Sequence, residues 1–200
     1  MGSEVLIYGY GIVCLCMLGY NLCYSVHLRL GDRRQERRVR WMGGLVEAQL
    51  ARIREGQPVL KWHLPAMQSR LIRLNNLLAM QQFLQDSTES PQVLGEYFLQ
   101  TREMLLNLAG IYAKREDTQA ACFCHLLTIN AKFVEPMAKE LEPVLLRSIR
   151  KQSLYCRVNA LKALCAFCSA QGVYSAFRFL ARGEGTPIHE KGLVEALLTH

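Results

Sequence analysis

The sequence lacks the patterns that would assign it to a class of enzyme. It contains no nucleophile elbow, phosphate-binding loop or H-E-x-x-H motif, and its five histidines are scattered along the chain. It also has no convincing alternation of polar and apolar residues, the period-2 pattern that predicts β-strands. We therefore expect an all-α protein without a catalytic centre, a cofactor or a small-molecule substrate.

The N-terminus lacks the features of a cleaved secretory signal. Its first residues include Glu4 but no lysine or arginine, and no A-x-A pattern follows. What is present is an apolar run over residues 5–26, in which only Asn21 and Ser25 are clearly polar. In a helix, roughly 20 such residues cross a hydrocarbon core of about 30 Å. Residues 1–28 are therefore predicted to form a single transmembrane anchor.

A cluster of arginines follows the apolar run at once. Segment 29–40 holds six arginines and two acidic residues, so it contributes +4 to a formal net charge of +7. Positive charge marks the cytoplasmic flank of a span, which places the N-terminus outside and the remaining chain in the cytoplasm of a cell membrane, by expectation bacterial. The cluster is expected to face anionic lipid headgroups rather than nucleic acid, because no nucleic-acid motif or interleaved aromatics accompany it. Its members are Arg29, Arg33, Arg34, Arg37, Arg38 and Arg40.

Beyond the anchor, apolar residues recur at helical spacing. The basic juxtamembrane segment, residues 29–57, is predicted to contain a linking helix that can bend at Gly43-Gly44 and is stopped by Gly56-Gln57-Pro58. Residues 58–90 form a helical cap with one amphipathic stretch at 66–84. Further helices are expected at 91–114, 117–132, 136–150, 153–170 and 173–182, and from Pro187 onward.

The later helices suggest a repeat. Paired as hairpins, their second helices would begin near Asp117, Ser153 and Pro187, at offsets of 36 and 34 residues. A repeat near 35 residues is typical of stacked helical hairpins, and an irregular helical bundle is the alternative. Residues 153–167, SLYCRVNALKALCAF, resemble the second helix of a HEAT repeat, with a polar turn, an arginine, and then Ala and Leu at helical spacing. The resemblance implies a HEAT-like α-hairpin array, an α-solenoid, over residues 91–200.

This architecture implies a membrane-anchored scaffold or adaptor that binds a protein partner at the inner membrane face. Arg147, Arg150, Lys151 and Arg157 cluster around one turn and form either a solvated edge or a basic ridge for an acidic partner. Two rival functions stay open. One is a HEAT-like enzyme or enzyme subunit similar to the bilin lyases, and the other is a basic nucleic-acid binder similar to the HEAT-like DNA glycosylases.

Five of the eight cysteines lie in the predicted cytosolic body, where structural disulfides are not expected. Cys122 and His125 can share a helix face, as can Cys165 and Cys168. Together these four would supply an acceptable Cys3His ligand set for zinc. Both pairs lie in helices with good apolar periodicity, where a free cysteine behaves as a small hydrophobic residue. We therefore expect core packing and no metal.

Overall fold

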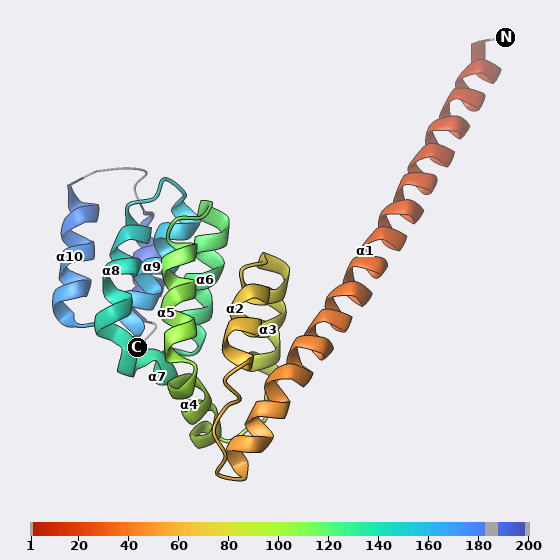
Figure 1. Cartoon of the computed structure of the whole chain (residues 1–200). Coiled ribbons are helices and arrows are strands. Elements are labelled where there is room, and N and C mark those ends of the chain that lie inside the picture. Colours follow the sequence, from red (N-terminus) through yellow and green to blue (C-terminus); the bar gives the residue numbers. More distant parts are fainter. Residues whose placement is uncertain (1, 183–187, 199–200) are drawn as a thin grey trace.

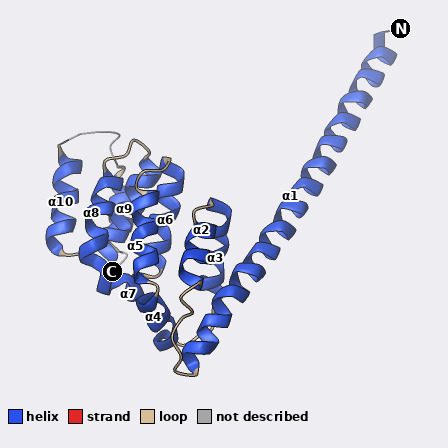
Figure 2. Ribbon diagram, in the orientation of Figure 1, coloured by secondary structure: helices blue, strands red, loops and turns tan. Residues whose placement is uncertain are grey.

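The protein is all-helical over the residues that its computed structural model describes, 2–182 and 188–198, with side chains described from residue 9 onward. Figure 2 shows helices and loops and no strand within these ranges. One long helix, α1, projects from a body formed by the other helices (Figure 1). The all-α prediction is confirmed for this part of the chain.

Helix α1 (Gly2–Arg54) runs without a break for 53 residues, or about 80 Å at 1.5 Å per residue. Over residues 9–34 every side chain except that of Cys14 is exposed, including large apolar ones such as Leu15 at 69 %. Among the described residues, α1 is the one helix long and apolar enough to cross a membrane. Farther along, its apolar side chains enter the core of the body. Those fully buried are Met42, Val46 and Leu50.

Helix α1 passes through Gly43 and Gly44 without interruption, so the helix has no break where the sequence allows a bend. Gly43 is a site of close packing, where an added Cβ would lie 2.6 Å from Cδ2 of Phe83. An added Cβ at Gly44 would meet nothing within 4 Å. The predicted end of the helix is confirmed: α1 ends at Arg54, and Gly56 has a φ of 73°, a left-handed conformation that glycine adopts without strain.

The body contains more, shorter helices than the sequence predicts. The stretch at 66–84 is divided between α2 and α3, and the helix predicted at 91–114 is divided into α4 and α5. Thr101 lies at this second break, where its buried hydroxyl donates to the carbonyl oxygen of Tyr97 at 2.8 Å. Pro187 lies outside the described residues. The helices are α2 (His63–Leu71), α3 (Leu74–Asp86), α4 (Pro91–Gln100), α5 (Arg102–Tyr112), α6 (Asp117–Ile129), α7 (Ala131–Val134), a 3-10 turn (Glu135–Met137), α8 (Ala138–Ile149), α9 (Leu154–Phe167), α10 (Ala170–Ala181) and α11 (Glu190–Leu197).

Serine caps fix three of the helix starts. The side chains of Ser90, Ser153 and Ser169 accept hydrogen bonds from backbone N–H groups in the first turns of α4, α9 and α10. Such a cap satisfies one of the N–H groups that a helix start leaves without a partner. Pro91, which follows Ser90, occupies the first helical position, where its missing N–H costs nothing.

The helices of the body contact one another as two rows. In the first row, α2, α5, α8 and α10 each contact the next, and in the second row α3, α6, α9 and α11 do the same. Contacts also join α2 to α3, α5 to α6 and α8 to α9 across the rows, while α1 packs on α3 and α4. Helix α9 contacts α6, α7, α8, α10 and α11, which explains why most of its side chains are buried.

A few polar groups in the core are satisfied locally. His63 is 1 % exposed and shares a hydrogen bond with the hydroxyl of Tyr97 at 3.1 Å. The hydroxyl of Tyr112 donates to the carbonyl oxygen of Leu71 at 2.6 Å, which ties α5 to the end of α2. Burial lowers the pKa of His63 to about 4, with a smaller effect from the nearby Arg70 cation. The imidazole is therefore neutral at physiological pH.

Candidate functional site: a basic groove beside helix α5

The structure separates the four residues of the predicted basic ridge. Arg147 and Arg150 are exposed in and just after the last turn of α8. Lys151 is partly buried and donates to the carbonyl oxygen of Arg115 at 2.6 Å and to Asp117 at 3.3 Å. Arg147 and Arg150 therefore remain as surface cations, while Lys151 joins two turns.

Arg157 does not belong to a surface ridge, because it is 1 % exposed. It is the largest of the fully buried side chains, and its guanidinium carbon lies 6.0 Å from the ring centroid of Phe179 in α10. Arg150 approaches the same ring at 5.7 Å. The sequence places Arg157 at a polar position of α9, but the packing of neighbouring helices around α9 covers it. This residue is a core contact between α9 and α10.

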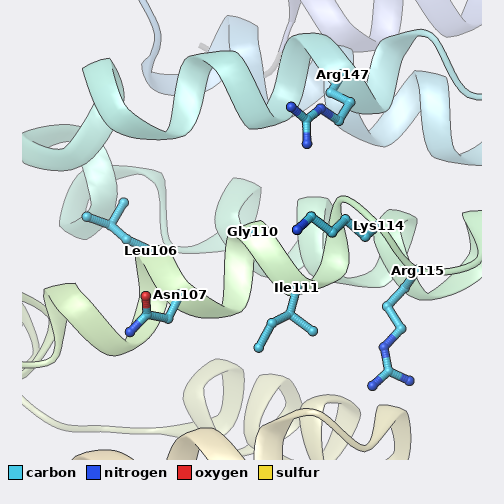
Figure 3. A pocket seen from close by; sticks show the side chains of 7 residues that line it. All are labelled: Leu106, Asn107, Gly110, Ile111, Lys114, Arg115 and Arg147. Carbon is cyan, nitrogen blue, oxygen red and sulfur yellow. The ribbon is translucent and has the colours of Figure 1, made fainter.

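Arg147 instead lines a groove of about 510 Å³ along the exposed face of α5. In Figure 3, Arg147 points from α8 toward α5, and Lys114 extends from the end of α5 below it. Gly110 forms the middle of the groove, where an added Cβ would meet nothing within 4 Å. The remaining lining residues are Leu106, Asn107, Ile111 and Arg115. The groove thus combines three cations with two aliphatic side chains and has no acidic residue in its wall.

Sequence reasoning missed Lys114 and Arg115 as parts of this site. The signal was available, because they precede Arg150 and Lys151 by 36 residues, the same offset that separates Asp117 from Ser153. The contact from Lys151 to Arg115 shows that these two turns lie side by side.

A second hollow, of about 500 Å³, lies on the second row of helices. It is lined by residues of α6, α9 and α11 that include His125, Tyr155 and Asn159, and an ion pair of 3.0 Å joins Lys162 to Glu195 beside them. Burial and the Lys162 cation lower the pKa of His125. The hydrogen bond and charge of Lys162 lower the pKa of Glu195. The charges of this hollow therefore largely neutralise each other, unlike those of the groove beside α5.

The four residues considered as zinc ligands are not brought together. Cys122 and His125 lie in the middle of α6, whereas Cys165 and Cys168 lie at the end of α9. The two helices pack in parallel, so that Cys124 of α6 is near Cys156 at the start of α9. Among the described residues, no group of three or more His, Cys, Asp or Glu side chains could hold a metal ion.

The cysteines of the body are protonated thiols at neutral pH. Burial is the largest cause in each case, and it raises the pKa of Cys124 and Cys168 to about 12 and that of Cys156 to about 11. The pKa values of Cys122 and Cys165 are also raised by burial. A reactive cysteine needs an environment that stabilises the thiolate, and none of these five has one.

The arginines of segment 29–40 occupy the part of α1 between its exposed apolar half and its packed half. All are exposed except Arg38, which is half-buried. Nothing in the body covers the apolar residues on their N-terminal side from residue 9 onward. The basic cluster therefore lies at the boundary between the two halves of one helix.

No protein-family model matches the sequence, and neither the curated proteins nor the solved structures contain a match. The assignment of a function therefore rests on the chain's own residues.

Proposed function

We propose that this chain is a single-pass membrane protein whose helical body is a cytoplasmic scaffold or adaptor for a protein partner at the inner membrane face. The observation that carries the proposal is the division of α1 into two halves. Its first half exposes a continuous apolar surface that water would not tolerate and a bilayer would cover. Its second half is part of the core of the body. The arginines between the halves favour a cytoplasmic body.

The two rows of helices support a HEAT-like hairpin array. In such an array each hairpin contacts its neighbours, and no hairpin buries its apolar face alone. The second-row helices α6, α9 and α11 begin at Asp117, Leu154 and Glu190, which are 37 and 36 residues apart. The similar spacing of these three helices and the contacts between successive members of each row favour a solenoid over an irregular bundle.

The groove beside α5 is the proposed partner site. Its cations Lys114, Arg115 and Arg147 would attract an acidic segment, and Leu106 and Ile111 offer apolar contact along the same wall. An extended or helical segment carrying carboxylates fits this combination, because charge complementarity favours the correct partner and speeds its encounter. The anchor restricts that encounter to the membrane plane, which raises the effective concentration of a membrane-bound partner.

The membrane assignment is tested first. Membranes from cells that express the full chain are extracted with alkaline carbonate, and sealed vesicles of known orientation are treated with trypsin. We expect the protein to stay in the pellet and the body to be digested only from the cytoplasmic side. Release by carbonate would contradict the anchor, and digestion from the outer side would contradict the orientation.

The partner site is tested by photo-crosslinking in native membranes. A photoreactive amino acid at Asn107, which is exposed in the groove, should capture a discrete product. Gly110→Leu adds a side chain to the groove at a position where an added Cβ meets nothing within 4 Å, and it should abolish that product. Gly44→Leu, at an exposed helical glycine with the same open space around an added Cβ, should leave the product unchanged. A product that persists in Gly110→Leu would contradict the assignment of the groove.

A further inference from the structure

Successive helices of the two rows run in opposite directions, so the body has two distinct ends. In Figure 1 the ends of α2, α5, α8 and α10 lie toward the side on which the N-terminal half of α1 projects. We call the residues at these helix ends the anchor-side edge: 70–73, 114–117, 147–151 and 178–182. The bond from Lys151 to Asp117 joins two of these segments, and Arg70 lies 5.2 Å from the ring centroid of Trp41 in α1.

Charge is distributed unequally between the two ends. The anchor-side edge holds nine lysines and arginines and two acidic residues, whereas the opposite end, residues 52–61, 86–103 and 132–142, holds six basic and eight acidic residues. Most of the anchor-side cations are free to meet another surface. Those with exposed side chains are Arg73, Lys114, Arg115, Arg147, Arg150, Arg178 and Arg182.

Helix capping does not account for this asymmetry. A cation near a helix C-terminus is stabilised by the helix dipole, and α2, α8 and α10, which end at the anchor-side edge, each carry an arginine in the last turn. The helices α3, α6, α9 and α11 end at the opposite side, yet none has a basic residue in its last turn. A dipole effect would apply to both sets equally. Helix α1 also ends at the opposite side and carries Arg52 and Arg54 in its last turn, but Arg54 is paired with Glu47 and Glu89. Among the helices of the two rows, the cations therefore follow one end of the body.

The position of this edge along α1 matches a membrane surface. Trp41, which contacts the edge through Arg70, lies about 20 Å along the helix from Leu28, the last apolar residue before the basic segment. Arg73 follows the end of α2 on the side of the bilayer. A headgroup layer adds about 5 to 8 Å to the hydrocarbon core, and the potential of an anionic leaflet extends about 8 Å further. Flexible arginine and lysine side chains span the remaining distance between the anchor-side edge and the headgroup region.

We propose that the anchor-side edge docks on the anionic lipid headgroups of the same bilayer that α1 crosses. The inference rests on the proposed anchor and adds a second, electrostatic contact that fixes the orientation of the body. Docking would hold the body against the cytoplasmic leaflet, and the groove cations Lys114, Arg115 and Arg147 would face headgroups until an acidic partner segment replaces them. Because α1 is continuous into the core, the two contacts act on one rigid unit and reinforce each other.

Lysine footprinting of the full chain in lipid nanodiscs tests the docking. The discs contain either phosphatidylcholine alone or an equimolar mixture with phosphatidylglycerol, and acetylation is followed by mass spectrometry. We expect Lys114 at the anchor-side edge to be acetylated severalfold more slowly in the anionic discs, and high salt should remove the difference. Lys61, Lys132 and Lys139 at the opposite end should react equally in both discs.

Two charge-reversal variants provide the matched comparison. Arg73→Glu/Arg150→Glu/Arg182→Glu should abolish the protection of Lys114, and Lys61→Glu/Lys132→Glu/Lys139→Glu should retain it. Each variant changes the charge equally and loses one cation–ring contact.

Equal acetylation of Lys114 in both discs, with the protein still resistant to carbonate, would overturn the docking and leave the anchor intact. Protection in native membranes but not in anionic discs would assign the edge to an acidic protein and would also overturn the docking. Release by carbonate would overturn the anchor and the docking together.

Discussion

The carboxylate of Asp117 accepts a hydrogen bond of 2.8 Å from the backbone N–H of Ser153, although the two residues are 36 positions apart. The second carboxylate oxygen accepts from Lys151 at 3.3 Å, and Lys151 also donates to the carbonyl of Arg115. These bonds tie the turn between α5 and α6 to the turn between α8 and α9. They hold together the part of the body that carries the basic groove and the anchor-side edge.

Removing this carboxylate should weaken the junction of the two turns. Asp117→Ala leaves the N–H of Ser153 and the ammonium of Lys151 without their acceptor, which should lower the free energy of unfolding by about 1 to 2 kcal/mol. Asp117→Asn keeps an acceptor oxygen and should lose less. Urea unfolding in mild detergent measures the free energy of unfolding of both variants. Equal losses would show that hydrogen-bond acceptance by the side chain at position 117 does not stabilise the junction.

Gly43 and Gly44 offer adjacent substitutions with opposite expected signs. Gly43→Ala places a methyl group against the ring of Phe83, and overpacking of this kind should cost about 1 to 3 kcal/mol. Gly44→Ala meets open space and should stabilise the helix by about 0.5 to 1 kcal/mol. The same urea experiment compares the pair. If Gly43→Ala is stabilising, α1 and α3 do not approach as closely as described.

The stability of the body should fall on acidification through the titration of His63. Its pKa is lowered from 6.5 to about 4 in the folded state, so between these values the unfolded chain binds a proton that the folded chain does not. The contribution of neutral His63 to the free energy of unfolding is therefore fully present above about pH 6.5 and declines as the pH falls toward about 4. This contribution is at most about 3 kcal/mol.

The non-titrating variant His63→Gln isolates this contribution. Its free energy of unfolding, measured at several pH values between those limits, should depend less steeply on pH than that of the wild type. Parallel pH profiles for the two proteins would mean that His63 is not held neutral by burial.

Arg157 and Arg150 should differ sharply in their effect on stability. Arg157→Ala removes a fully buried side chain from between α9 and α10, and the loss of its packing and contacts should cost about 3 kcal/mol. Arg150→Ala, at an exposed neighbour of the same ring, should stay within about 0.5 kcal/mol of the wild type. Similarly small effects for both variants would show that Arg157 is exposed, as in the surface ridge that the sequence predicts.

The cysteines of the body should react slowly with a water-soluble maleimide at neutral pH. Burial both raises their pKa values and restricts access, and the thiolate is the reacting form. Mass spectrometry should find Cys122, Cys124, Cys156, Cys165 and Cys168 labelled quickly only after addition of urea. Rapid labelling of one of them in the folded protein would favour the enzyme alternative similar to bilin lyases.

Local signals in the sequence predict much of the helical structure. Pro91 after a serine cap, the polar turn before α9 and the glycine after Arg54 each place a helix end close to where it lies, because each acts on its own neighbourhood. The break at Thr101 has no glycine or proline to announce it. It arises where a buried hydroxyl donates to the preceding turn and where α4 and α5 pack against different helices.

The candidate site depends on contacts that local signals do not contain. In a sequence, a glycine is compatible with either a flexible position or a site of close packing. Gly43 is identified as a packing site only by the position of Phe83, which is 40 residues away along the chain. Arg157 has the spacing of a surface residue until α10 covers it. Lys114 and Arg147 become neighbours across the groove only when α5 and α8 lie side by side.

The continuity of α1 also has a mechanical consequence. A span that is longer than the local hydrocarbon thickness accommodates the mismatch by tilting, and no loop or hinge separates the proposed span of α1 from the core of the body. Any tilt or rotation of the apolar half must therefore turn the whole body by the same angle. With the proposed anchor, the distance of each helix end from the lipid surface would therefore depend on bilayer thickness.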